Sequence, residues 1–234
     1  TRSFWVPYNF DHDFVSIFDD ENGIDIYMNK YLITVHQYID YLNEAYADPL
    51  ENFTIGNYGD LSGICNGESH QLYAQLYYDQ LFDEQTNIAW IDFNQNNNLF
   101  YLVNSSDGLD YTNHPVVNVS WCGAEAFTKH YNLDLPSSSL WNKALHNNDE
   151  LYELPTPYES NFNFSDSGDP WEYGTTPVGY YNGTDYGNFQ TEDAASIYGE
   201  YDLIGNVLEW SSETGNCLGG SFIYDRGEFE EINN

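Results

Sequence analysis

Hydrophobic residues recur at helical spacing after Thr34. Thr34 and Gln37 form a T-x-x-Q capping box, in which each side chain satisfies the other residue's backbone amide at a helix start. The inward positions of this predicted helix are Tyr38, Tyr41, Leu42 and Ala45. The pattern therefore predicts an amphipathic helix that begins at Thr34 and buries a largely aromatic face.

Three further segments have a helical pattern or a helix start signal. His70–Phe82 is amphipathic and predicts a short helix. Its inward residues are Leu72, Leu76 and Tyr77. Ser120 is a good N-cap for a helix that runs to about Tyr131. Ser137 is a cap for another helix, which starts within LPSSSLW and has Trp141 on its inner face.

The remaining hydrophobic runs predict strands and loops. Extended runs are expected at Ser3–Phe10, Ile24–Ile33 and His114–Trp121, and residues 87–93 and 99–103 flank NQNNN as a β-hairpin. Residues 56–67 read as a loop. Residues 159–187 are rich in Gly, Asn, Asp and Ser but also in aromatic residues, which predicts a packed, ion-pinned loop region rather than disorder.

Length and composition are those of one large domain over residues 1–234. Hydrophobic residues make up 41% of the 234-residue chain, and much of this mass is tyrosine, which buries a ring and leaves a hydroxyl to satisfy. No apolar run reaches 18 residues, so we expect no membrane insertion. The chain starts at Thr1, so a leader could already have been removed.

The net charge narrows the range of partners. There are 38 Asp and Glu residues against five Lys and Arg, a formal net charge of -33. Neutralising phosphates needs basic residues, so nucleic acid binding and attraction to an anionic membrane are both disfavoured. Such a surface either provides solubility in a salty or extracellular medium, or it depends on bound cations.

Cysteines and glycosylation sequons are compatible with secretion. Cys65, Cys122 and Cys217 allow one disulfide with a lone thiol, or three free thiols. Four sequons in loop-like contexts are candidate glycosylation sites: Asn52, Asn104, Asn163 and Asn182. A fifth, Asn118, lies in a strand-like run and is not expected to be modified. An extracellular glycoprotein is the expected class.

Oxygen ligands gather in the block YDLIGNVLEW, which ends at Trp210. Asp202 and Glu209 supply carboxylates, and the backbone carbonyls of Gly205 and Val207 can turn inward between them. Calcium takes six to eight oxygens of this mixed kind. The alternative is that Asp202 and Glu209 cap turns and face water.

Four segments together resemble the formylglycine-generating enzyme (sulfatase-modifying factor) family. They are IYMNKYLITVHQYIDYL, NHPVVNVSWCGAEAF, LDLPSSSLWNKAL, and YGEYDLIGNVLEW followed by GGSF, in the family's order over about residues 24–222. The resemblance implies an α+β fold of the C-type lectin-like kind, with small antiparallel sheets, two or three helices and long loops. It also implies two calcium sites. The first would use Asp202, Gly205, Val207 and Glu209, and the second Asn163, Phe164, Asp169 and Trp171.

The family's catalytic residues have no counterpart in this chain. Its enzymes hold copper with two thiolates just after the Gly-Gly-Ser, because soft Cu(I) prefers sulfur. Tyr224 and Phe229 stand at those positions, and Cys217 precedes the motif. We also expect no counterpart of the family's terminal strand after the Gly-Gly-Ser. We therefore expect no catalysis and no copper.

Three functions are compatible with these features. The first is a non-catalytic extracellular module, a self-assembling structural subunit of a filament or surface layer that is stabilised by calcium and contacts copies of itself. The second is a lectin-like protein that binds a glycan or a surface protein, with Tyr224 and Phe229 as exposed ligand-binding aromatics. The third, least favoured, is a copper-dependent oxidase.

Overall fold

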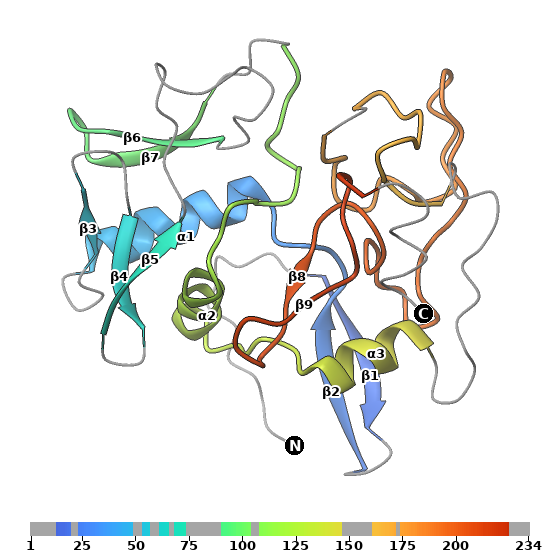
Figure 1. Ribbon diagram of the computed structural model, residues 1–234, viewed down its shortest axis with the longest axis horizontal. Coiled ribbons are helices and arrows are strands. Elements are labelled where there is room, and N and C mark those ends of the chain that lie inside the picture. Colours follow the sequence, from blue (N-terminus) through green and yellow to red (C-terminus); the bar gives the residue numbers. More distant parts are fainter. Residues whose placement is uncertain are drawn as a thin grey trace. The chain divides into compact units, whose positions relative to one another are not determined.

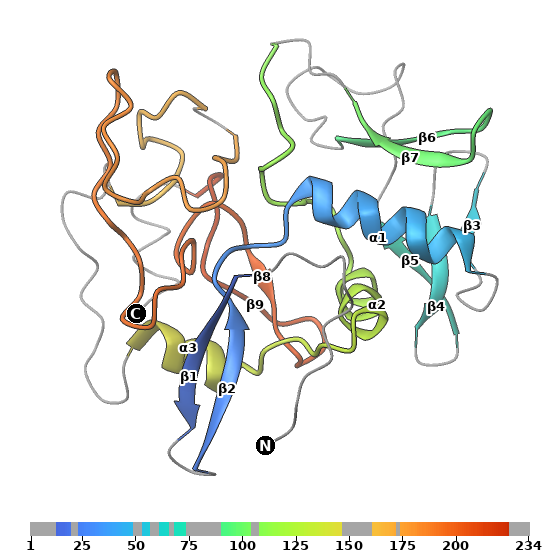
Figure 2. The same ribbon diagram turned by 180° about the vertical axis from the view of Figure 1, so that it is seen from behind.

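The protein is an α+β structure with small antiparallel sheets, as the sequence predicts (Figures 1 and 2). The computed structural model describes residues 13–19, 23–48, 53–56, 61–65, 68–73, 90–103, 108–146, 161–171 and 174–224, and these form three helices. The chain divides into two compact units, Thr1–Phe10 with Ile33–Leu135 and Asp11–Leu32 with Pro136–Asn234. Each unit has its own hydrophobic core. The assignment of residues 1–234 to one domain stays a prediction.

The first unit packs two helices against short sheets. Its elements are α1 (Val35–Ala47), β3 (Thr54–Ile55), β4 (Leu61–Cys65), β5 (Glu68–Tyr73), β6 (Ile91–Asn94), β7 (Leu99–Leu102) and α2 (Trp121–His130). Helix α1 lies along β7, and α2 packs on β5 (Figures 1 and 2). Tyr41 is fully buried, and its ring meets that of Phe127 edge-on at 5.3 Å. This core is therefore aromatic, as the pattern after Thr34 predicts.

Local capping signals predict both helix starts in this unit correctly. The Thr34 hydroxyl accepts a hydrogen bond from the Gln37 amide, and the Gln37 side chain accepts one from the Thr34 amide at 2.9 Å. The Ser120 hydroxyl accepts from the Gly123 amide at 3.0 Å and begins α2. These contacts satisfy amide groups that a helix start leaves without partners.

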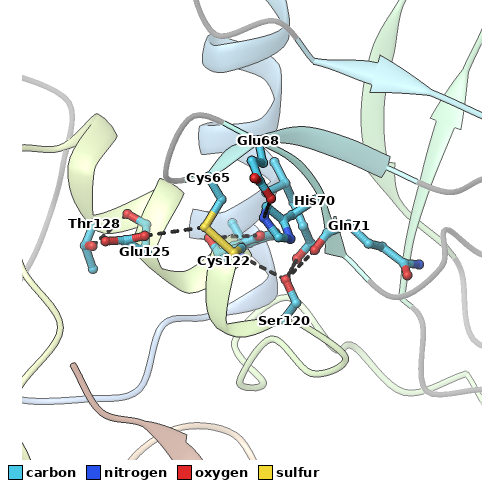
Figure 3. Close-up of a disulfide and its surroundings, with 11 residues drawn as sticks. Cys65, Glu68, His70, Gln71, Ser120, Cys122, Glu125 and Thr128 are labelled. Carbon is cyan, nitrogen blue, oxygen red and sulfur yellow. Dashed lines mark hydrogen bonds and ion pairs between the residues drawn. A yellow bond between two sulfur atoms is a disulfide. The ribbon is translucent and has the colours of Figure 1, made fainter. Parts of the chain in front are cut away.

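A disulfide links β4 to α2 (Figure 3). Cys65 and Cys122 are 57 residues apart in sequence and their Cα atoms are 5.7 Å apart. Glu125 on α2 lies beside this bond, with its Oε2 3.5 Å from the Cys65 sulfur. Cys217 is free and partly buried. Of the two alternatives that the sequence allows, the structure contains one bridge with a lone thiol.

The second unit joins a β-hairpin, one helix and a large proportion of loop. Its elements are β1 (Phe14–Asp19), β2 (Ile24–Asn29), α3 (Ser138–His146), β8 (Glu209–Trp210) and β9 (Cys217–Leu218). Trp141 on α3 is 2% exposed and packs in a core with Phe162 and Phe164. The Ser137 hydroxyl accepts from the Leu140 amide, as predicted for the helix start. The aromatic-rich loop region buries Phe162, Phe164, Tyr180 and Tyr181, as expected of a packed loop, whereas residues 182–187 are exposed and ion binding in this region stays a prediction.

Three sequence predictions of secondary structure are wrong where the structure describes them. Residues 61–65 form the strand β4 instead of a loop, and residues 70–73 belong to the strand β5 instead of a helix. Both differences have one cause, the antiparallel pairing of β4 with β5. His114–Trp121 is not a strand: Pro115 makes one isolated bridge with Thr34, and Asn118 turns the chain at a φ of 61°. The predicted strand Ser3–Phe10 and residues 74–82 lie outside the described residues.

The hairpin predicted around NQNNN is confirmed as β6 and β7. The run Ile24–Ile33 is a strand only as far as Asn29. In the described part of the chain no helix has the length and apolar character needed to cross a membrane.

Candidate functional site

The block that carries the predicted oxygen ligands is a tight series of turns. Asp202, Gly205 and Asn206 have positive φ angles of 62°, 78° and 56°. A Cβ at Gly205 would lie 2.6 Å from the Asn163 carbonyl oxygen, so a larger residue does not fit. The Gly205 amide donates to the Gly219 carbonyl at 2.8 Å. Close approach between three loop segments therefore fixes the backbone here.

Asn206 holds the block to the preceding loop. Its side chain accepts from the Thr176 amide at 3.1 Å and donates to the Thr176 carbonyl at 3.2 Å. Its own amide donates to the Asn163 carbonyl at 3.0 Å. Asn206 is 1% exposed. This role was not predicted for Asn206, although its place between Gly205 and Val207 in the motif is a signal.

The two predicted carboxylates are half-buried and hydrogen-bonded. Asp202 accepts from the Gly179 amide at 2.6 Å, and Glu209 accepts from the Trp141 indole at 3.1 Å. Burial raises the pKa of Asp202 to about 6. Burial raises the pKa of Glu209 to about 8, and repulsion from Asp202 and Glu200 adds to this effect. Burial thus disfavours the charged forms of both groups, and repulsion disfavours that of Glu209 further.

Successive backbone carbonyls of the block differ in whether they accept a hydrogen bond. The Asn206 carbonyl accepts from the Phe222 amide at 3.0 Å. The carbonyls of Gly205 and Val207, on either side, accept no hydrogen bond from any described residue. These are the two carbonyls predicted as cation ligands. Together with the carboxylates of Asp202 and Glu209 they are oxygen types that calcium prefers.

The second predicted set is more fully hydrogen-bonded. Asp169 is 4% exposed and accepts from the Ser167 hydroxyl, the Trp171 amide and the Tyr181 hydroxyl. The Phe164 carbonyl accepts from the Ser167 amide, and the Trp171 carbonyl accepts from the Gly174 amide. The structure brings these residues into one loop, but internal donors already occupy most of their oxygens. This set fits a cation less well than the first.

Neither set contains three acidic side chains. Among the described residues, no group of three His, Cys, Asp or Glu side chains is arranged to hold a metal ion. A site at Asp202 and Glu209 would depend on backbone carbonyls for its remaining ligands, as calcium sites commonly do.

Tyr224 is not an exposed ring. It is partly buried against the core of the second unit, and its backbone pairs with Ser165 and Ser221. The ring is therefore only partly accessible, and its role in ligand binding stays a prediction. Phe229 lies outside the described residues.

The described sequons differ in accessibility. Asn163 is 2% exposed and its side-chain amide donates to the Gly174 carbonyl at 2.9 Å, so the folded structure disfavours a glycan there. Asn182 is exposed, with its side chain accepting from the Thr184 amide. Asn118 is also exposed, contrary to its expected place in a strand. Asn52 and Asn104 lie outside the described residues.

Glu200 is a buried acid that the sequence analysis did not single out. It is 1% exposed, with one carboxylate oxygen bonded to the Ser196 hydroxyl and no partner for the other among the described residues. Burial raises its pKa. Nothing in the local sequence distinguishes Glu200 from the many other acids of the chain.

Comparison with known proteins assigns most of the chain to one family profile. The profile described as "Sulfatase-modifying factor enzyme 1-like domain" matches residues 22–227. The serine/threonine-protein kinase Pkn1 of Chlamydia trachomatis serovar L2 is 34% identical over 106 residues, which cover 44% of this chain and 14% of that protein. The formylglycine-generating enzyme of Thermomonospora curvata is 29% identical over 117 residues, which cover 44% of this chain and 35% of that enzyme. The chain matches well under two thirds of either relative.

Proposed function

Because the chain belongs to the sulfatase-modifying factor enzyme 1-like family, we propose that it is a non-catalytic member. In this proposal it is an extracellular module that is stabilised by calcium. It acts by protein–protein interaction, including assembly with copies of itself.

One observation carries the proposal. The chain keeps the oxygen ligands that the family uses for calcium, but other residues replace the two cysteines that the family's enzymes use for copper. The carbonyls of Gly205 and Val207 are left without donors from the described residues, in the same block as the half-buried carboxylates of Asp202 and Glu209. Tyr224 and Phe229 stand where the family's enzymes have copper-binding cysteines. Phenol and phenyl groups cannot supply a thiolate to Cu(I).

Electrostatics supports the proposal that calcium stabilises the chain. No lysine, arginine or histidine occurs between His146 and Arg226, so this stretch has no basic side chain to compensate its buried acids. Burying uncompensated carboxylates is costly. A divalent ion on Asp202 and Glu209 would remove that cost and connect the turns of the block. When bound, calcium would supply charge neutralisation and no redox chemistry.

The non-catalytic part is tested with copper and a substrate. The protein is incubated with Cu(I) and a cysteine-containing sulfatase peptide, with the Thermomonospora curvata enzyme as the positive control. We expect no change in the mass of the peptide. Oxidation of the peptide cysteine at a rate similar to that of the control would refute this part of the proposal.

Three observations support an extracellular, assembling module. A disulfide between Cys65 and Cys122 fits an oxidising compartment. The second unit exposes large apolar side chains, among them Ile197 at 62% and Ile223 at 64%. A net charge of -33 would repel copies of the chain until cations screen it.

The assembly part is tested by sedimentation velocity over a range of protein concentrations, with calcium and with a chelator. We expect larger species with calcium and monomer with the chelator. A monomer at every concentration with calcium present would overturn self-assembly and leave the calcium site itself to be tested separately.

A further inference from the structure

The segment from Asn182 to Asp193 forms an exposed hairpin-like projection of the second unit. Isolated bridges pair Asn182 with Asp193 and Asp185 with Gln190. The Tyr186 amide donates to the Phe189 carbonyl at 3.0 Å and closes the tip. Figures 1 and 2 both show its two passes, in orange, running side by side to a common end. The projection has a defined backbone.

Tyr186 is a fixed aromatic ring on this projection with surface open to solvent. Its ring stacks on that of Tyr180 at 4.3 Å between centroids and 16° between planes. Its hydroxyl donates to the Tyr180 carbonyl at 3.2 Å. Tyr180 is 3% exposed, whereas Tyr186 is 43% exposed. Tyr180 therefore supports one face of the Tyr186 ring from inside the unit, and part of the Tyr186 ring remains accessible.

The projection that carries Tyr186 is acidic. Asp185 precedes it, and Glu192 and Asp193 follow on the returning pass; all three are exposed. The Asp185 side chain accepts from the Gly187 amide at 2.7 Å, which holds the carboxylate at the turn that contains Tyr186. No basic residue occurs between His146 and Arg226. An aromatic face attracts cations, and nearby carboxylates strengthen that attraction.

The same unit already places a cation on stacked tyrosines. The rings of Tyr31 and Tyr201 are 5.6 Å apart and inclined at 18°. The Lys30 ammonium lies 5.1 Å from the centroid of Tyr31 and 5.6 Å from that of Tyr201. Asp193 accepts from the Tyr201 hydroxyl at 2.9 Å. A stacked tyrosine pair with a carboxylate beside it is thus a cation-holding arrangement in this protein.

We propose that Tyr186 and Asp185 form a binding site for an organic cation, the guanidinium or ammonium group of a basic peptide segment. The ring face contacts the cation, and the Asp185 carboxylate pairs with it. Tyr180 and the hydrogen bond to its carbonyl hold the Tyr186 ring in place before binding. The site does not depend on calcium at Asp202 and Glu209.

The test is an NMR titration of the full chain in saturating calcium, with the Tyr186 ring protons as the reporter. The probes are an acetylated, amidated Gly-Arg-Gly peptide, the Gly-citrulline-Gly peptide, whose side chain has the same shape without charge, and maltotriose as a neutral sugar. We expect the arginine peptide to shift the Tyr186 resonances saturably. The citrulline peptide and the sugar should bind at least about tenfold more weakly.

Four variants distinguish the contribution of the Tyr186 ring to binding from its contribution to folding. Y186L still covers Tyr180 but has no aromatic face, and it should weaken arginine peptide binding by roughly three- to tenfold. Y186F keeps the face and should retain most of the affinity. D185N can still accept from the Gly187 amide but has no charge, and it should weaken binding. Y27A removes a tyrosine of similar exposure (52%) on β2 and should have no effect.

Three results would overturn the proposal. They are equal binding of the arginine and citrulline peptides, unchanged affinity of a folded Y186L, and stronger binding of maltotriose than of the arginine peptide. The last result would instead indicate a neutral sugar site on the same ring.

Discussion

At the scale of single residues, Gly205 has the strictest requirement in the candidate cation site. Its φ of 78° disfavours any side chain, and a Cβ would meet the Asn163 carbonyl oxygen at 2.6 Å. We expect Gly205→Ala to lower the free energy of unfolding by about 3 kcal/mol, from backbone strain together with the clash. Urea denaturation measures this change.

Gly215 supplies the matched control. Its φ is 79°, but a Cβ there would meet nothing within 4 Å. Gly215→Ala should therefore cost only about 1 kcal/mol, the strain alone. Equal costs for the two variants would show that close approach to Asn163 does not constrain Gly205.

Asp202 and Glu209 predict how stability depends on pH without calcium. Their pKa values in the folded protein are about 6 and about 8, above the ordinary range of carboxyl groups. Between about pH 4 and pH 8 the folded state therefore binds more protons than the unfolded state. Stability from these groups is complete at the acid end of this window and is lost as the pH rises through it. In a chelator, the melting temperature should be lower at pH 8 than at pH 5.

Glu209→Gln is the control for that experiment, because glutamine can still accept from the Trp141 indole but does not ionise. The variant in chelator should show a smaller decrease in melting temperature from pH 5 to pH 8. A decrease as large as in the unmodified protein would assign the effect to the general charge of -33 instead of to this site.

At the scale of elements, the disulfide is the main covalent constraint of the first unit. Cys65 on β4 and Cys122 on α2 close a loop with a sequence separation of 57 residues. Restricting the unfolded chain in this way stabilises the fold by about 4 kcal/mol. We expect Cys65→Ser with Cys122→Ser to lose stability of that order in urea denaturation. Cys217→Ser, which removes the free thiol, is the comparison and should cost much less.

Elements with a local signal could be predicted from the sequence. The capping box of Thr34 and Gln37 lies within four residues, and both helix caps at Ser120 and Ser137 are equally local. The strands β4 and β5 could not be predicted, because pairing between Gly63 and His70 decides their conformation. Leu72 is fully buried, which a helix and a strand explain equally well, so its hydrophobicity could not distinguish them.

In the candidate site too, residues with a local sequence signal could be predicted and their distant partners could not. The motif indicates Asp202, Gly205, Val207 and Glu209 directly. The partners that enclose them come from distant positions: Trp141 is 68 residues from Glu209, and Asn163 is 43 residues from Asn206. Periodicity and local composition carry no information about such contacts, so the structure was needed to find them.

At the scale of the whole molecule, we expect the net charge of -33 to make stability and assembly depend on cations. Self-repulsion destabilises a compact acidic chain and keeps copies apart. A bound divalent ion would act on both effects, first by neutralising half-buried carboxylates and then by reducing repulsion between chains. Calcium should therefore be needed for full stability and for assembly.

The melting temperature of chelator-treated protein, measured with and without added calcium, shows whether calcium binds and stabilises the folded chain. Binding to the folded state alone stabilises it in proportion to the logarithm of the ligand concentration. We expect the melting temperature to rise with calcium in the unmodified chain and to rise much less in Glu209→Gln. A melting temperature that calcium leaves unchanged in the unmodified chain would contradict the proposal that calcium stabilises the fold.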